Sequence, residues 1–221
     1  MATMQRTRVV CVDDDTPIRE GLPHLLPDVD MVATFARVEH MLQRHPAADL
    51  ILLDLHLLAP DEEANATRHG LRGVQAVTNA GYRTLIYTNE QRRGVLAVCL
   101  AAGANGVVFK TSSMPALREA VTVVAGGGTV IPTSLAGLVE KYSSLGHLGQ
   151  LSPRQLEVLR ARARGEPFKS IARRLGIDQR TVEDHMYAVT RRFADYLRTH
   201  SLADLEHELG IAPRDLLDPD G

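Results

Sequence analysis

The sequence predicts an α/β domain built on a parallel sheet, followed by a smaller all-α domain. From Arg8 to Ala125, short apolar runs alternate with amphipathic segments, which is the pattern of βαβ units. From Leu151 onward, apolar residues recur at helical spacing instead. The chain has 221 residues, which is enough for two small domains.

Four of the apolar runs are predicted strands, at residues 9–12, 50–53, 85–87 and 107–109. The expected helices cover about 16–27, 37–45, 73–80, 91–102 and 114–125. Gly103 and Gly106 bracket the turn into the last strand, and Gly126 to Gly128 end the last helix. The pattern gives a flavodoxin-like (βα)5 count of five strands and five helices, assigned to residues 1–127.

Residues 128–148 are rich in Gly, Ser and Thr and are expected to form a linker with a short helix near 134–143. Ser152, Pro153 and Gln155 then have the pattern of a helix start with a capping box, and Gly165 ends that helix. Helices are predicted next at about 168–175 and 179–194, joined by a turn at Gly176. Two helices joined by a tight glycine-containing turn describe a helix-turn-helix, assigned to residues 149–221.

Five residues at the ends of the four predicted strands form a candidate site: Asp13, Asp14, Asp54, Thr88 and Lys110. Ligands of an open parallel sheet bind at the carboxyl ends of its strands, so these side chains should meet at one edge. Carboxylates suit Mg²⁺, and phosphoryl transfer needs positioning and charge neutralisation. We therefore expect Asp13, Asp14 and Asp54 to hold the metal, Asp54 also to accept a phosphoryl group, and Thr88 and Lys110 to bind the oxygens of that group.

An alternative is that acids at strand ends only cap the following helices. This alternative is favoured for Asp15, which stands directly before Thr16 and Pro17 at a helix start. It does not account for a threonine and a lysine at the ends of two further strands.

The composition favours a cytoplasmic protein. No apolar run approaches the roughly 20 residues of a membrane span, and the N-terminus lacks the apolar stretch of a signal peptide. Cys11 and Cys99 both lie in apolar runs and are expected to be reduced core residues rather than a disulfide or metal pair. The net charge of −2 gives no global sign of nucleic-acid binding.

Residues 7–127, including Gly103-Ala104-Asn105-Gly106, resemble the receiver domain of two-component response regulators. The resemblance implies that the backbone carbonyl of His56 also ligates Mg²⁺ and that a histidine kinase donates the phosphoryl group. The sequence departs from the receiver pattern in an acidic Ala59–Arg72 segment that is longer than usual. It also has Val107 in place of an aromatic residue and Thr111 in place of proline.

Leu151 to Phe193 resembles the LuxR-type helix-turn-helix of the NarL/FixJ regulators. The matching residues are Leu151-Ser152-Pro153-Arg154, Glu157-Val158-Leu159, Gly165, Ile171-Ala172, Leu175-Gly176-Ile177, Thr181-Val182 and His185. This resemblance implies base-facing positions for Glu183, Asp184 and Tyr187. The full expected DNA-binding set is Lys169, Arg180, Thr181, Glu183, Asp184, Tyr187, Arg191 and Arg192.

The predicted third helix has an apolar stripe of Val182, Met186, Val189 and Phe193, with Arg180, Glu183, Asp184, Tyr187 and Arg191 expected to face outward. Carboxylates on a recognition helix can accept from cytosine amino groups, but acids there can also simply favour the helix N-terminus. For His185, a packing role is favoured over base contact. The sequence leaves the role of the acids open.

Local charge agrees with DNA binding, because residues 149–193 contain ten basic and five acidic residues. Residues 194–221 contain two basic and seven acidic residues. That acidic segment is either a solvated face or a part that tunes DNA contact or dimerisation. A last helix near 201–209, where relatives often dimerise, is also expected.

These features predict a transcription regulator, not an enzyme, that binds double-stranded DNA as a homodimer after a histidine kinase phosphorylates Asp54. The alternative is a phosphorylation-independent regulator whose receiver pocket responds to a small ligand or protein partner. The long segment and Val107 favour the alternative, while the complete set of five residues favours phosphorylation. A phosphorylation sink that binds no DNA is disfavoured by the helix-turn-helix.

Overall fold

The computed structural model describes residues 6–57, 66–200, 204 and 207. Residues 58–65 of the long acidic segment, and most of the helix expected near 201–209, lie outside the described residues. The chain divides into two compact units. The first comprises Met1–Glu90 and Ala102–Gly127, and the second comprises Gln91–Ala101 and Gly128–Gly221.

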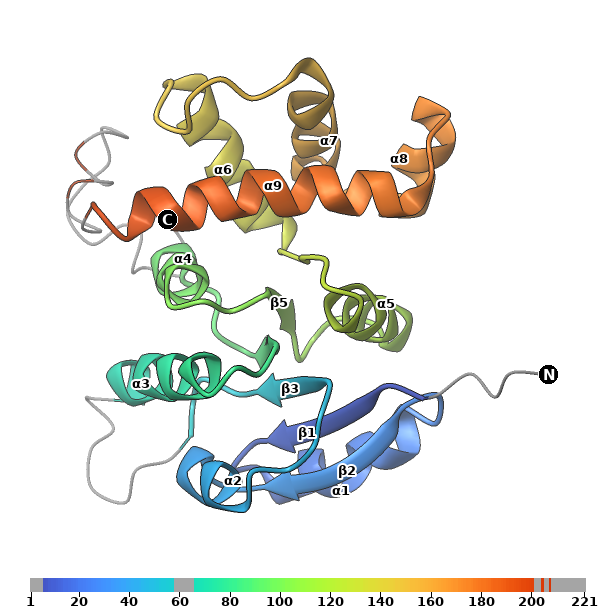
Figure 1. The fold of residues 1–221 in the computed structure, drawn as a ribbon, viewed down its shortest axis with the longest axis vertical. Coiled ribbons are helices and arrows are strands. Elements are labelled where there is room, and N and C mark those ends of the chain that lie inside the picture. Colours follow the sequence, from blue (N-terminus) through green and yellow to red (C-terminus); the bar gives the residue numbers. More distant parts are fainter. Residues whose placement is uncertain (1–5, 58–65, 201–203, 205–206, 208–221) are drawn as a thin grey trace. The chain divides into compact units, whose positions relative to one another are not determined.

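The first unit is built on a five-stranded parallel sheet with the order β2-β1-β3-β4-β5, which is the flavodoxin-like order (Figure 1). The strands are β1 (Arg8–Val12), β2 (Asp30–Phe35), β3 (Leu50–Leu53), β4 (Thr84–Thr88) and β5 (Gly106–Phe109). Its helices are α1 (Thr16–Leu25), α2 (Val38–Arg44), α3 (Ala66–Asn79) and α5 (Met114–Ala125). The predicted fold of this part is confirmed.

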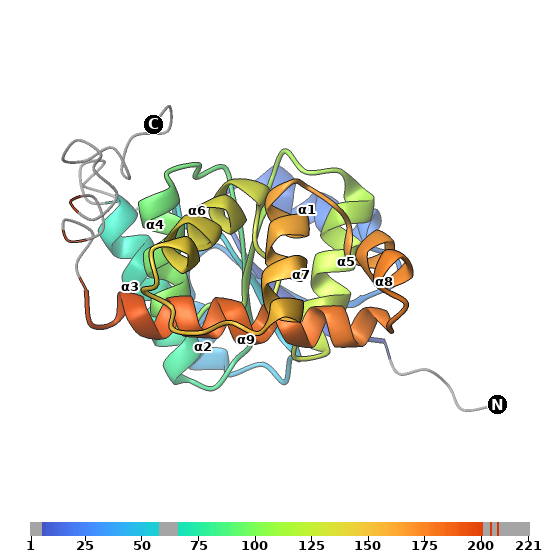
Figure 2. The same cartoon turned by 90° about the horizontal axis from the view of Figure 1, so that it is seen from above.

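Helices cover both faces of the sheet, with α1 and α5 on one face and α2 and α3 on the other (Figure 2). Arg118 on α5 donates to the carbonyl of Leu25 at the end of α1 at 3.0 Å, which joins the first pair. Strands β3 and β4 are buried at every residue, as a sheet covered on both faces requires. The site residues Asp54 and Thr88 accordingly stand at the carboxyl ends of these two strands.

Strand β2 was not among the apolar runs. It alternates half-buried and exposed residues because, among the strands that the structure describes, it lies at the edge of the sheet beside β1. Helix α3 begins at Ala66, before the predicted start near 73. Asp15 lies at the N-cap of α1 as expected, but its side chain makes no capping hydrogen bond.

Both cysteines are buried and free, as predicted. Burial raises the pKa of Cys11 to about 12, and the nearby charge of Asp13 adds to the effect. The Cys11 thiol therefore stays protonated in the core.

Gly70, inside α3, lies against the chain that follows β3. A Cβ atom built at Gly70 would stand 2.3 Å from the backbone oxygen of Leu55, a contact that a side chain cannot make. We expect Gly70→Ala to lower the free energy of unfolding by about 2 kcal/mol, because the helix or the loop must shift. Urea denaturation followed by circular dichroism measures this change.

Gly21 in α1 provides the matched control, because a Cβ there has nothing within 4 Å. Gly21→Ala should leave stability unchanged or raise it by up to about 1 kcal/mol, from helix propensity alone. Equal effects of the two substitutions would show that Gly70 is not a close-packing position.

The second unit contains α4 (Arg93–Ala101), α6 (Thr133–Ser144), α7 (Pro153–Ala163), α8 (Phe168–Leu175) and α9 (Gln179–Leu197). The predicted capping box is present: Ser152 accepts from the Gln155 amide, and the Gln155 side chain accepts from the Ser152 amide. Gly176 adopts φ of 63° in the turn between α8 and α9, where a left-handed residue is required. The predicted helix-turn-helix is confirmed.

Segment 128–148, predicted to be a linker with a short helix, contains the twelve-residue helix α6, which packs against α7. Tyr142 of α6 is fully buried, and its ring contacts that of Phe193 on α9 with centroids 5.7 Å apart. Much of this segment therefore belongs to the core of the second unit. In the described part of the chain, no helix is both long and apolar enough to span a membrane.

Candidate functional site

The carboxyl ends of β1, β3 and β5 bring two carboxylates and an amine together. Lys110 Nζ lies 2.7 Å from Asp54 Oδ2 and 2.8 Å from Asp13 Oδ2. Asp13 and Asp54 are 1% and 4% exposed, so this pairing is largely removed from water. The sequence-predicted meeting of Asp13, Asp54 and Lys110 at one sheet edge is present in the structure.

The two oxygens of Asp54 have different surroundings. Oδ1 accepts hydrogen bonds from the backbone amides of Leu55 at 2.7 Å and His56 at 3.3 Å. Oδ2 faces Lys110. The loop after β3 thus fixes the carboxylate, while Lys110 supplies the positive charge beside the oxygen that points into the site.

Asp13, Asp14 and Asp54 form a candidate cation site, because one carboxylate oxygen from each lies within 4.8 Å of the others. Asp13 Oδ2 is buried and lies 2.8 Å from Nζ of Lys110. The other oxygen, Oδ1, accepts from the Asp15 amide at 3.0 Å. Hard carboxylate oxygens with an unused lone pair fit Mg²⁺.

Burial, the largest influence, raises the pKa of Asp13, and hydrogen bonds from Lys110 and the Asp15 amide offset only part of that rise. Burial lowers the pKa of Lys110, but its hydrogen bonds and charge pairs with Asp13 and Asp54 outweigh burial and leave the pKa raised. Lys110 therefore keeps its charge at neutral pH. One lysine offsets only part of the charge of the three carboxylates Asp13, Asp14 and Asp54, so the site retains negative charge that a cation would neutralise.

Thr88 ends β4 and is fully buried. Its Oγ1 accepts from the amide of Glu90 at 3.2 Å and lies 3.4 Å from Nδ1 of His56. Nε2 of His56 lies 3.5 Å from Oε2 of Glu90, which is 5% exposed. The sequence analysis did not identify Glu90 or the side chain of His56 as site residues. The sequence feature that could have pointed to them is their position, because His56 stands two residues after Asp54 and Glu90 two residues after Thr88.

The exposed face of α9 is a stripe of four side chains three or four residues apart, which we call the reading stripe: Arg180, Asp184, Tyr187 and Arg191. The opposite face consists of Val182, Met186, Val189 and Phe193, all fully buried as predicted. A recognition helix presents such a polar face to the major groove.

The other residues of the expected DNA-binding set differ in exposure. Glu183 is 7% exposed and accepts from Gln179 at 2.9 Å, so the expectation that it faces outward was wrong. Arg192 is exposed but donates to the carbonyl of Gln150 at 2.6 Å. Lys169 on α8 is exposed, and Thr181 is half-buried.

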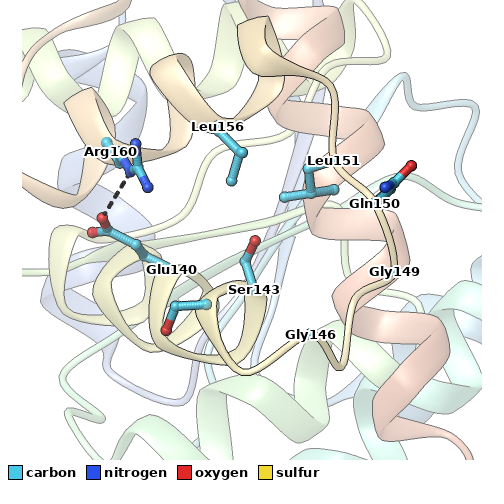
Figure 3. Close-up of a pocket in the computed structure, with 9 residues that line it drawn as sticks. Glu140, Ser143, Gly146, Gly149, Gln150, Leu151, Leu156 and Arg160 are labelled. Atoms are coloured by element: carbon cyan, nitrogen blue, oxygen red, sulfur yellow. Dashed lines mark ion pairs between the residues drawn. The ribbon is translucent and has the colours of Figure 1, made fainter.

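A separate hollow of about 540 Å³ lies within the second unit, between α6, the loop after it and α7 (Figure 3). An ion pair between Glu140 and Arg160, at 3.5 Å, joins the two helices at its wall. Leu151 and Leu156 supply apolar lining, and Ser143 lies beside Glu140 on α6 (Figure 3).

Residues 149–208 match the family model described as bacterial regulatory proteins, luxR family. The chain is 24% identical to the transcriptional regulatory protein LnrK of Bacillus subtilis, over 88% of this chain and 94% of the relative. It is 26% identical to the nitrate/nitrite response regulator protein NarL of Escherichia coli, over 84% of this chain and 88% of the relative.

Among solved structures, the Salmonella typhimurium RcsB response regulator has the same fold, with a TM-score of 0.54 at 20% identity. The match covers 94% of this chain and 100% of that one. Together with the sequence matches, these findings support a DNA-binding response regulator of the NarL/FixJ type, with a luxR-family match confined to residues 149–208. The named relatives are regulators rather than enzymes, in agreement with the expectation for this chain.

Proposed function

We propose that this response regulator is switched by phosphorylation of Asp54, that a histidine kinase supplies the phosphoryl group, and that the site uses Mg²⁺. The observation that carries the proposal is the placement of Lys110 within 2.8 Å of both Asp13 and Asp54 at the end of the sheet. Two buried acids and one largely buried lysine have little structural value in a core, since apolar residues of similar size would be as stable. Such a group of charged side chains is useful at a site that binds a charged ligand, such as a metal cation or a phosphoryl group.

Each residue has a task in this proposal. Oδ2 of Asp54 is the nucleophile, because Oδ1 is held by two backbone amides. Lys110 moves its pairing from the Asp54 carboxylate to the incoming phosphoryl oxygens, and Thr88 donates to another of them. Asp13, Asp14, Asp54 and the backbone carbonyl of His56 would hold Mg²⁺, which would supply positive charge to offset that of the phosphoryl group.

The output is DNA binding by α9 in a homodimer, since two half-sites multiply a modest affinity per domain. We propose residues 1–127 as the regulatory domain and 149–221 as the DNA-binding domain. Asp184 and Tyr187 of the reading stripe contact bases, and the basic residues Arg180, Arg191, Lys169 and Arg192 contact or flank the phosphates together with Thr181. Glu183 supports the helix from its buried position, held by Gln179.

Beryllofluoride with Mg²⁺ tests the switch, because it occupies a phosphoryl-accepting carboxylate without covalent chemistry. We expect wild-type protein to bind it, to become more dimeric in sedimentation, and to bind genomic DNA fragments more tightly. Asp54→Asn should show none of these changes. Failure of the wild-type protein to respond would favour a regulator whose receiver pocket binds a small ligand or a protein partner instead.

A further inference from the structure

An ion-paired cluster occupies the first two turns of α9. Arg180 Nε lies 3.3 Å from Asp184 Oδ1, and Arg180 Nη1 lies 3.8 Å from Glu183 Oε2. Arg180 and Asp184 are 54% and 60% exposed, so their pairing takes place in water at the surface expected to meet DNA. An exposed pair of this kind is weak and exchanges easily.

The cluster is poorly placed to stabilise the helix. Arg180 stands in the first turn of α9, where the helix dipole disfavours a positive charge. No acidic residue lies in that turn, and Glu183 and Asp184 come after it, where the effect of the dipole has faded. The alternative that these acids serve the helix N-terminus therefore has little support.

A carboxylate on the reading stripe affects DNA binding in two ways. It is repelled by the phosphates of any sequence, and its ion pair engages Arg180, which would otherwise bind a phosphate. It can recover that loss only where a base offers an amino group in the major groove, as cytosine does through N4. Asp184 is therefore suited to weaken binding to most sequences more than to the right one.

We propose that Arg180 and Asp184 form a specificity filter. While Arg180 is paired with Asp184, it does not bind the DNA backbone, and it is released when a cytosine amino group takes its place at the Asp184 carboxylate. The inference rests on the proposed use of α9 as the recognition helix. On non-cognate DNA, Arg180 stays paired and contributes little. On a site with cytosine opposite Asp184, Arg180 is released and gains a phosphate contact.

The test measures binding of the full chain to a fluorescent duplex of scrambled sequence by anisotropy over a series of salt concentrations. We expect Asp184→Asn to tighten this binding by about fivefold and to steepen the salt dependence by about one phosphate contact. In an Arg180→Gln background, the same Asp184→Asn change should give no gain. That background separates release of Arg180 from simple loss of a negative charge.

Asp195→Asn is the matched control. Asp195 lies on the same helix and pairs with Arg198 at 2.5 Å, but at the end remote from the first turns. It should leave affinity and salt dependence unchanged. A second measurement selects bound duplexes from a pool with a randomised centre: wild-type protein should enrich cytosine at one position in each half-site, and Asp184→Asn should lose that preference.

Two results overturn the filter. One is an equal gain in DNA affinity from Asp184→Asn with and without Arg180, which would mean that the gain comes only from removing the repulsion between Asp184 and the phosphates. The other is unchanged affinity together with an unchanged selected sequence. If the wild-type protein and every variant fail to retain any duplex, the DNA-binding function itself is wrong, and this outcome is distinct because no binding curve is obtained.

Discussion

Replacing Lys110 by methionine is expected to lower the free energy of unfolding by about 3 kcal/mol at neutral pH in the absence of divalent cations. Lys110 is 12% exposed and is shared by Asp13 and Asp54. Without it, two buried carboxylates repel each other with no compensating charge. Chemical denaturation of the two proteins, with a chelator present, measures the difference.

The loss should depend on pH. The pKa of Asp13 is already raised by burial, and it rises further when Lys110 is removed. A carboxyl group with a higher pKa in the folded than in the unfolded state destabilises the fold as pH rises above its unfolded value. The stability deficit should therefore shrink as pH falls from about 7 toward about 4, and Mg²⁺ should restore part of it at neutral pH.

Lys141→Met is the control for this prediction, because Lys141 is an exposed lysine on α6. It should change stability by less than about 0.5 kcal/mol at any pH. A deficit for Lys110→Met that is as small as the control, or that grows at low pH, would contradict the buried charge cluster.

Phe193→Ala should be the most destabilising change in the second unit, by about 4 kcal/mol. Phe193 is fully buried on the inner face of α9 and contacts the ring of Tyr142, so its removal leaves a cavity between α9 and α6. Urea denaturation of the variant measures the loss. Apparent DNA affinity should fall together with stability, because only the folded fraction of the variant can bind DNA.

Tyr187→Ala distinguishes the DNA-binding role proposed for the exposed face of α9 from the packing role of its buried face. Tyr187 is 37% exposed on the reading stripe, and its truncation should cost little stability. It should nevertheless reduce DNA affinity about tenfold, because an aromatic ring at a base-facing position is lost. If Tyr187→Ala unfolds the protein and Phe193→Ala does not, the assignment of the two faces of α9 is reversed.

The sequence predicted the bounds of those strands and helices that are determined by residues close together in the chain. Strand β3 and helices α5 and α8 begin and end at the predicted residues, since a continuous apolar run or a clear start and stop defines each of them. The capping box at Ser152 follows from two residues in fixed spacing. Asp13, Asp54 and Lys110 meet because the carboxyl ends of parallel strands share an edge.

Features that depend on position in the fold could not be predicted in this way. Strand β2 is an edge strand, and its half-exposed residues lack an apolar run. The burial of Glu183 depends on what surrounds α9, and helical periodicity alone placed it outward. Segment 128–148 has the composition of a linker, but Leu135, Val139 and Tyr142 give α6 a buried face.

The His56–Glu90 pair shows a further limit. Each residue stands two positions after a predicted site residue, but nothing in either local sequence indicates that the side chains approach within 3.5 Å. Only the neighbouring positions of β3 and β4 in the sheet bring them together.

The most direct test of the switch is the intact mass of the protein after incubation with acetyl phosphate and Mg²⁺. We predict a gain of one phosphoryl group in the wild-type chain that is absent from Asp54→Asn and is lost when Mg²⁺ is chelated. A gain that persists in Asp54→Asn would place the acceptor elsewhere. No gain in the wild-type chain, with acetyl phosphate or a kinase donor, would contradict phosphorylation of Asp54 as the switch.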